Sequence, residues 1–122
     1  MRILLVDDNE VNRDMLSRRL CRRGFNVVTA ANGAIAIEVA TRELPDIILM
    51  DMNMPVLNGW DATRALKAAE STQGIPVVAL TADDMIEDHE KALSAGCDYF
   101  ETKPIDFERL LRTVARATDR VA

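Results

Sequence analysis

Short apolar runs in this chain end repeatedly at charged or hydroxyl side chains. The residues at these ends are Asp7, Asp8, Asp51, Thr81 and Lys103. Four apolar residues bounded by turn signals, such as 47–50 before Asp51, are typical of a strand buried on both faces of a parallel sheet. A carboxylate at the end of such a strand costs desolvation free energy unless another group compensates it. The polar residues at the strand ends are therefore the first candidates for a functional site.

Carboxylates that converge would create a site for a cation. Two unit charges about 4 Å apart interact by roughly 4 kcal/mol at an effective dielectric of about 20, so three carboxylates in one crevice repel strongly. Oxygen ligands of this kind suit Mg²⁺, which keeps several waters and also takes a phosphate oxygen. Mn²⁺ could substitute for it. A carboxylate beside a divalent cation, a lysine and a hydroxyl can attack a phosphoryl group and form an acyl phosphate. Asp51 would be that nucleophile, while Mg²⁺, Lys103 and Thr81 would hold the phosphoryl oxygens in the transition state.

The hydrophobic pattern alternates strands with helices along the whole chain. Strands are predicted over residues 3–6, 25–29, 47–51, 76–81 and 99–102. Helices are predicted from about Val11 to a cap at Gly24, over 34–42, 60–69 and 84–95, and after a cap at Asp106. Asn32-Gly33 is predicted as a turn. In the first helix Val11, Met15, Leu16 and Leu20 recur at roughly helical spacing, which predicts an apolar stripe opposite the arginines.

Five strands alternating with five helices predict a doubly wound α/β fold. In this architecture helices cover both faces of a parallel sheet and the crossovers are right-handed. Ligands bind beyond the carboxyl ends of the strands, at the point where the strand order reverses. The polar residues at the strand ends should therefore meet in one crevice.

Composition and charge exclude several classes of protein. The chain has 122 residues, 48% of them hydrophobic and 29% charged, which indicates one globular domain over 1–122. The net charge of -5, with no basic stripe in the sequence, argues against direct nucleic-acid binding. No apolar stretch approaches the ~20 residues of a membrane span, and no signal peptide follows Met1, so a cytoplasmic protein is expected. Cys21 and Cys97 form no metal-binding motif and are expected to be reduced packing residues.

Four segments carry a resemblance to a known family. The strings LLVDDNEVNR, DIILMDMNMPVLNGW, PVVALTA and AGCDYFETKP resemble the successive signatures of response-regulator receiver domains of two-component signalling. Together they run from about Ile3 to Arg116. The chain resembles both single-domain response regulators and the receiver domains of hybrid kinases. It implies a flavodoxin-like receiver fold with strand order 2-1-3-4-5, and a monomer or weak dimer.

The resemblance also implies a reaction and its partners. Asp51 would accept a phosphoryl group from a phosphohistidine on a histidine kinase or a histidine phosphotransfer protein. The chain would catalyse only its own phosphorylation and dephosphorylation, and would pass the signal to a downstream protein target. The implied metal ligands are Asp7, Asp8, Asp51 and the backbone carbonyl of Asn53. The residues implied to contact the phosphoryl group are Thr81, Ala82 and Lys103.

Further residues match positions that tune the response in this family. Phe100 falls at the position of the switch aromatic, and Asn53 and Asp83 at positions that tune dephosphorylation. The resemblance implies a cis peptide bond before Pro104. Phe100 lacks the hydroxyl of the more usual tyrosine, so switching by packing alone is expected. The implied readout surface comprises helix 84–95, strand 99–102 and the last helix, with Met85, Ile86, His89, Tyr99, Arg109 and Arg112 as candidate face residues.

Other functions stay open from the residues alone. A haloacid-dehalogenase-like phosphatase also uses a strand-end Asp, a hydroxyl, a Lys and Mg²⁺, but it has an acid where this chain has Asn53, and it usually carries a cap domain. A flavodoxin-like FMN carrier shares the architecture, but Asp7 and Asp8 would repel the cofactor phosphate. A structural alternative is that Asp7, Asp8 and Asn9 merely cap the first helix. The remaining functional alternative is a pseudo-receiver that only binds partners, in which the acids would be coincidental.

Overall fold

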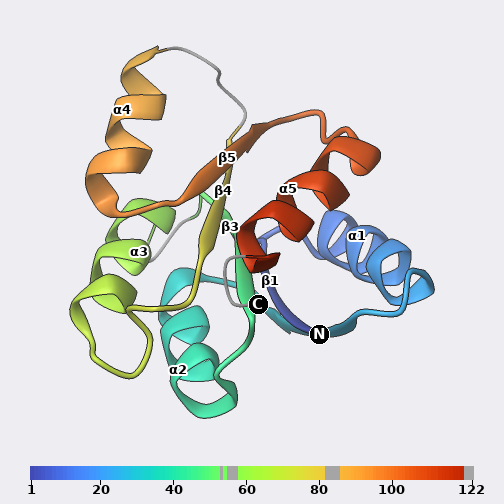
Figure 1. Cartoon of the computed structure of the whole chain (residues 1–122), viewed down its shortest axis with the longest axis horizontal. Helices are drawn as coiled ribbons and strands as arrows, with labels where there is room; N and C mark the ends of the chain where they lie inside the picture. The colour runs from blue at the N-terminus through green and yellow to red at the C-terminus, as the bar shows by residue number, and fades with distance from the viewer. Residues whose placement is uncertain (53, 55–57, 82–85, 120–122) are drawn as a thin grey trace.

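The computed structural model describes residues 1–52, 54, 58–81 and 86–119 (Figure 1). The strands are β1 (Arg2–Val6), β2 (Asn26–Ala30), β3 (Ile47–Asp51), β4 (Val77–Thr81) and β5 (Tyr99–Thr102). The helices are α1 (Glu10–Arg22), α2 (Gly33–Glu43), α3 (Gly59–Ala68), α4 (Ile86–Ala95) and α5 (Phe107–Asp119). All strands pair in parallel, in the order β2-β1-β3-β4-β5. The predicted fold class and strand order are confirmed.

Helices cover both faces of the sheet, which explains why the strands are continuous apolar runs. Side chains alternate between the faces, so Leu4 and Ile48 pack towards α2 and α3, while Leu5 and Leu49 pack towards α1 and α5. Figure 1 shows α2, α3 and α4 on one side of the sheet and α1 and α5 on the other. Among the described residues, none of the helices combines the length and apolar content needed to cross a bilayer.

Short polar side chains start the helices at the carboxyl end of the sheet. The side chains of Asn9, Asn32 and Asn58 each accept a hydrogen bond from a backbone N–H in the first turn of α1, α2 and α3. Asp106 accepts one from the Arg109 amide at 3.2 Å, so its predicted cap is confirmed. Gly33 lies inside α2, and the predicted Asn32-Gly33 turn was wrong because Asn32 caps the helix instead.

The prediction of the α1 stripe was wrong for two of its four residues. Leu20 is buried and Leu16 is half-buried against the sheet, but Val11 is 70% exposed and Met15 is 55% exposed. Residues 11 and 15 form one row on the helix, and residues 16 and 20 form the neighbouring row, turned by about 100°. Only the second row faces the core. Cys21, expected to pack, is also exposed, whereas Cys97 is buried.

Gly59 allows α3 to begin against the end of β3. A Cβ atom at this position would lie 2.5 Å from the carbonyl oxygen of Asp51 and 2.7 Å from the Cα atom of Met52. The Gly59 amide donates a hydrogen bond to the Met52 carbonyl at 3.2 Å. Because the crowding atoms belong to the backbone, they cannot rotate away. The absence of a side chain at Gly59 therefore allows α3 to begin in contact with the backbone of Asp51 and Met52.

Replacing Gly59 with alanine should destabilise the fold. We expect Gly59→Ala to lower the free energy of unfolding by about 2 kcal/mol, because overpacking outweighs the gain in helix propensity. Urea denaturation measures this change. The matched control is Gly74→Ala, where an added Cβ meets no heavy atom within 4 Å, and its stability should change little. Equal stability of the two variants would contradict the proposed crowding.

Candidate functional site

Carboxylates from neighbouring strands meet at the carboxyl edge of the sheet. Val6 in β1 lies opposite Met50 in β3. The next residues, Asp7 and Asp51, therefore lie beside each other at the ends of adjacent strands. One carboxylate oxygen from each of Asp7, Asp8 and Asp51 lies within 4.8 Å of the other two. Asp51 is 2% exposed and Asp7 is 5% exposed, whereas Asp8 faces solvent. The acidic cluster is thus buried on one side and open on the other.

Backbone and side-chain donors hold Asp7 in place. Its Oδ1 atom accepts a hydrogen bond from the Asn9 amide at 2.8 Å, and its carbonyl oxygen accepts one from Arg13 Nη1 at 2.8 Å. Asn9 itself caps α1 by accepting from the Asn12 amide at 3.0 Å. The cap therefore belongs to Asn9, and capping does not explain the carboxylates of Asp7 and Asp8. The sequence pattern does not predict this role of Arg13, because a contact from the first turns of a helix back to a strand end has no sequence signature.

Lys103 and Thr81 complete the group around Asp51. Lys103 Nζ lies 3.3 Å from Asp51 Oδ1, and the Lys103 amide donates to the Thr81 carbonyl at 2.7 Å. Thr81 is buried at the end of β4, one residue beyond Leu80, which is the strand partner of Asp51. The peptide bond between Lys103 and Pro104 is cis. The structure therefore brings together a carboxylate, an ammonium group and a strand end that carries a hydroxyl residue.

The charges of this group are unbalanced. Within the described part of the chain, three carboxylates cluster beside the Lys103 ammonium group, and two of the carboxylates are buried, so their mutual repulsion is weakly screened. A cluster of carboxylate oxygens that is open on one side suits a hard divalent cation that retains part of its water shell. A carboxylate with such neighbours can also act as a nucleophile towards a phosphoryl group.

Several predicted site residues lie beyond the part of the chain that the structure describes. These residues are Asn53, Ala82 and Asp83, together with Met85 of the expected readout surface. The side chains of Ile86 and His89 are likewise not described. Phe100 is described and lies half-buried against the core that α2 and α3 form with the sheet.

A groove of about 360 Å³ opens beside the acidic cluster. It runs between α1 and the segment that follows β5, and Asp7 and Lys103 belong to its wall. Its apolar lining includes Met15, Leu16 and Ile105. No pattern in the sequence predicts this groove, which extends from α1 to the acidic cluster.

The comparison with protein families agrees with this geometry. A family model for the response regulator receiver domain matches residues 3–115. The chain belongs to this family. It is therefore a receiver domain of two-component signalling, and the family assignment favours this class over the phosphatase and FMN-carrier alternatives.

Two named relatives show the range of proteins that carry such a domain. The chain is 40% identical over 113 residues to the protein PilH of Pseudomonas aeruginosa, and the match covers 93% of each chain. It is 43% identical over 117 residues to the response regulator PleD of Caulobacter vibrioides, covering 96% of this chain and 26% of PleD. The chain thus spans about a quarter of PleD.

Solved receiver domains have the same fold. The receiver domain of the sensor histidine kinase PA1611 from Pseudomonas aeruginosa, solved with a magnesium ion in its active-site cleft, superposes with a TM-score of 0.90 at 38% identity, covering 97% of both chains. The receiver domain of Ssk1 from Saccharomyces cerevisiae, solved with the histidine phosphotransfer protein Ypd1, gives a TM-score of 0.93 at 28% identity, covering 100% of this chain and 91% of that chain.

Neutralising Asp8 should stabilise the protein when divalent cations are removed by a chelator. We expect Asp8→Asn to raise the free energy of unfolding by about 1 kcal/mol, because it relieves repulsion with Asp7 and Asp51. Chemical denaturation in chelator measures the change. The control Asp14→Asn removes an exposed carboxylate within α1, which pairs with Arg18 at 3.2 Å, and should not stabilise. A loss of stability in Asp8→Asn would contradict the proposed repulsion.

Proposed function

We propose that this receiver domain transfers a phosphoryl group from a partner phosphohistidine to Asp51, with Mg²⁺ bound by the acidic cluster. The observation that carries the proposal is the convergence of the Asp7, Asp8 and Asp51 carboxylates within 4.8 Å, with Lys103 Nζ 3.3 Å from Asp51. A pseudo-receiver would have no need of this arrangement. The magnesium ion in the cleft of the PA1611 receiver domain supports the choice of metal.

The reaction is a displacement at phosphorus. A carboxylate oxygen of Asp51 attacks the phosphoryl group, the bond to the donor imidazole nitrogen breaks, and an acyl phosphate forms. Lys103 stabilises the negative charge on the phosphoryl oxygens, and the Thr81 hydroxyl donates a hydrogen bond to one of them. When bound, Mg²⁺ supplies further positive charge beside these oxygens.

The remaining assignments follow from family membership. The Asn53 carbonyl would complete the metal site and Ala82 would contact the phosphoryl group, while the side chains of Asn53 and Asp83 would tune dephosphorylation. The chain then acts as a signalling protein that catalyses only its own modification. The Ypd1–Ssk1 complex supports a histidine phosphotransfer protein as donor, and a histidine kinase serves the same role. We place the reaction in the cytoplasm and the domain over 1–122.

The output would pass through β5 to the surface formed by α4, β5 and α5. The phosphoryl group adds about -1.5 to -2 charge, Thr81 moves to meet it, and Phe100 repacks into the space that Thr81 leaves. Glu101, next to Phe100, is buried and accepts hydrogen bonds from Thr113 Oγ1 at 2.7 Å and Arg109 Nε at 3.1 Å. This network ties β5 to α5, so a change at Phe100 is transmitted to Arg109 on the surface.

Incubation with a small acyl-phosphate donor should add one phosphoryl group to the protein. We expect a labile mass increase that requires Mg²⁺ and is absent in Asp51→Asn, measured by intact-protein mass spectrometry. Asp61→Asn, an exposed carboxylate in α3, is the control and should be modified like the wild type. A folded wild-type protein that stays unmodified with Mg²⁺ present would identify a pseudo-receiver. Steady turnover of small phosphate esters would point to a phosphatase instead.

Mg²⁺ should also stabilise the fold by binding only the native state. At about 100 times its dissociation constant, we expect the free energy of unfolding to rise by about 2.7 kcal/mol in the wild type. Asp8→Asn should gain much less at the same concentration, because it lacks one ligand. Thermal unfolding across a Mg²⁺ titration measures both gains, and equal gains in the two proteins would remove Asp8 from the metal site.

A further inference from the structure

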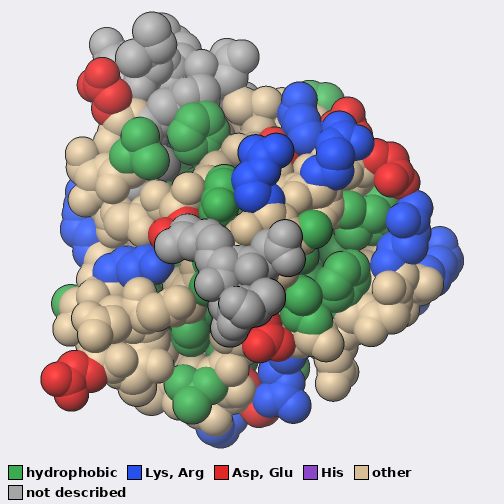
Figure 2. Space-filling model, in the orientation of Figure 1, with side chains coloured by type: hydrophobic (Ala, Val, Ile, Leu, Met, Phe, Trp, Pro, Cys, Tyr) green, Lys and Arg blue, Asp and Glu red, His purple; other side chains and the backbone are tan. Residues whose placement is uncertain are grey.

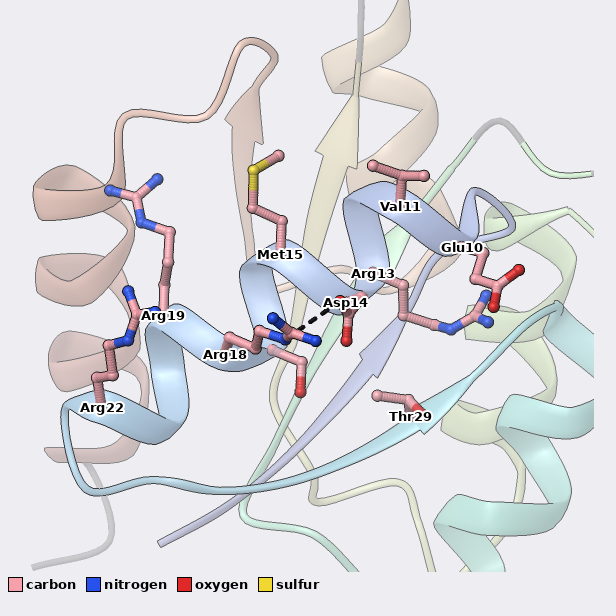
Figure 3. A pocket seen from close by; sticks show the side chains of 10 residues that line it. Glu10, Val11, Arg13, Asp14, Met15, Arg18, Arg19, Arg22 and Thr29 are labelled. Carbon is pink, nitrogen blue, oxygen red and sulfur yellow. Dashed lines mark ion pairs between the residues drawn. The ribbon is translucent and has the colours of Figure 1, made fainter.

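The outer side of α1 carries two exposed apolar residues one helical turn apart. Val11 is 70% exposed and Met15 is 55% exposed, and both project from the same side of the helix (Figure 3). The attachment of α1 to the sheet does not require them, because Leu16 and Leu20 already pack against the core. Adjacent exposed apolar side chains on one helix indicate a surface that another molecule covers.

Charged residues beside this pair divide α1 into an acidic half and a basic half. Glu10 and Asp14 occupy the first half, and Arg18 and Arg22 follow at the same spacing of four residues in the second. Asp14 and Arg18 pair at 3.2 Å within the helix (Figure 3). Figure 2 shows hydrophobic side chains between Lys and Arg side chains over α1 and α5. An acidic start and a basic end also suit the helix dipole, but the dipole does not account for the exposed apolar residues.

This order of charges is complementary to itself when two copies of the helix run antiparallel. A two-fold axis level with Leu16 brings Asp14 of each copy level with Arg18 of the other, because these residues lie two positions to either side of the axis. The two Met15 side chains then meet next to the axis. A parallel pair would instead oppose Asp14 to Asp14 and Arg18 to Arg18, and these like charges would repel. The sequence of α1 therefore fits a second copy of itself in one orientation.

We propose that the outer surface of α1 forms a weak antiparallel dimer with the same surface of a second copy of this chain. We call this surface the α1 face and define it by Val11, Asp14, Met15, Arg18 and Arg22. Val11 of each copy lies against the methylene groups of Arg22 of the other. Apolar contacts at Val11 and Met15 supply the affinity, and the charge pairs select the orientation. The inference does not depend on phosphoryl transfer.

The surroundings of α1 leave room for a second helix but limit the size of the interface. A hollow of about 880 Å³ lies between α1 and Thr29 of β2, so the neighbouring strand does not block the approach (Figure 3). One helix from each copy covers less than the about 1,200–2,000 Å² of a stable complex. We therefore expect a dissociation constant on the order of 100 μM. α4 lies in the other layer of helices and stays uncovered in this dimer (Figure 1).

Charge reversal within the α1 face tests the pairing. Asp14→Arg surrounds the two-fold axis with arginines and Arg18→Asp surrounds it with aspartates, so each variant should self-associate at least about tenfold more weakly than the wild type. Mixed in equal amounts, the two variants should associate with each other about as tightly as the wild type does, because each arginine again faces an aspartate. Sedimentation equilibrium at low salt, at concentrations up to about 1 mM, measures the wild type, both variants and their mixture.

The matched control is the pair Asp61→Arg and Arg64→Asp on α3. These two residues also form an exposed ion pair, at 2.8 Å, and neither control variant should change self-association. Each substitution in either pair changes the formal net charge of -5 by two units, so every variant stays negative and overall attraction cannot produce the recovery. A wild type that stays monomeric, a mixture without recovery, or the same effects in the α3 pair would overturn the inference.

Disulfide cross-linking tests the antiparallel orientation independently. The two Met15 positions lie next to the axis, so Met15→Cys/Cys21→Ser should form a disulfide-linked dimer on oxidation. The wild type is the control, because antiparallel pairing separates its two exposed Cys21 residues by roughly 15 Å along the helix axes, and Cys97 is buried. A variant that does not cross-link, or a wild type that cross-links equally fast, contradicts the antiparallel dimer.

Discussion

Repulsion among the carboxylates at the carboxyl edge of the sheet is the constraint on which the rest of the structure depends. Asp7 and Asp51 are buried beside each other because β1 and β3 are adjacent, and Asp8 adds a third negative charge. Such a cluster destabilises the fold unless positive charge is supplied. Lys103 supplies part of it directly. The negative charge that remains would suit a hard divalent cation.

A rigid framework holds these charges against their repulsion. The strands pack between two layers of apolar helix faces, so the ends of β1 and β3 cannot separate without opening the core. Gly59 seats α3 directly against the backbone after Asp51, and Arg13 bonds the Asp7 carbonyl from α1. The free energy gained by burying apolar side chains in the core thus offsets the repulsion at the edge of the sheet. This arrangement is common at functional sites.

The sequence predicted what depends on local pattern, and missed what depends on how distant segments meet. Buried strands and capped helices follow from apolar runs and short polar residues, and the convergence of strand ends follows from parallel topology. The strand order came from the family resemblance, because apolar runs do not specify their neighbours. The two rows on α1, Val11 with Met15 and Leu16 with Leu20, are equally apolar in sequence, and only the packed sheet decides which one is buried. Net charge likewise could not reveal that α1 and α5 lie side by side.

β5 connects the group around Asp51 to α5, because β5 and its exit segment contact both. Its exit segment places Lys103 beside Asp51, Phe100 packs into the α2–α3 side of the core, and Glu101 bonds α5 on the other side. Removing a partner from a buried, charged hydrogen-bond network is costly, so Glu101 and α5 should move together or not at all. Any displacement of this strand would therefore reach both helix layers through contacts that already exist.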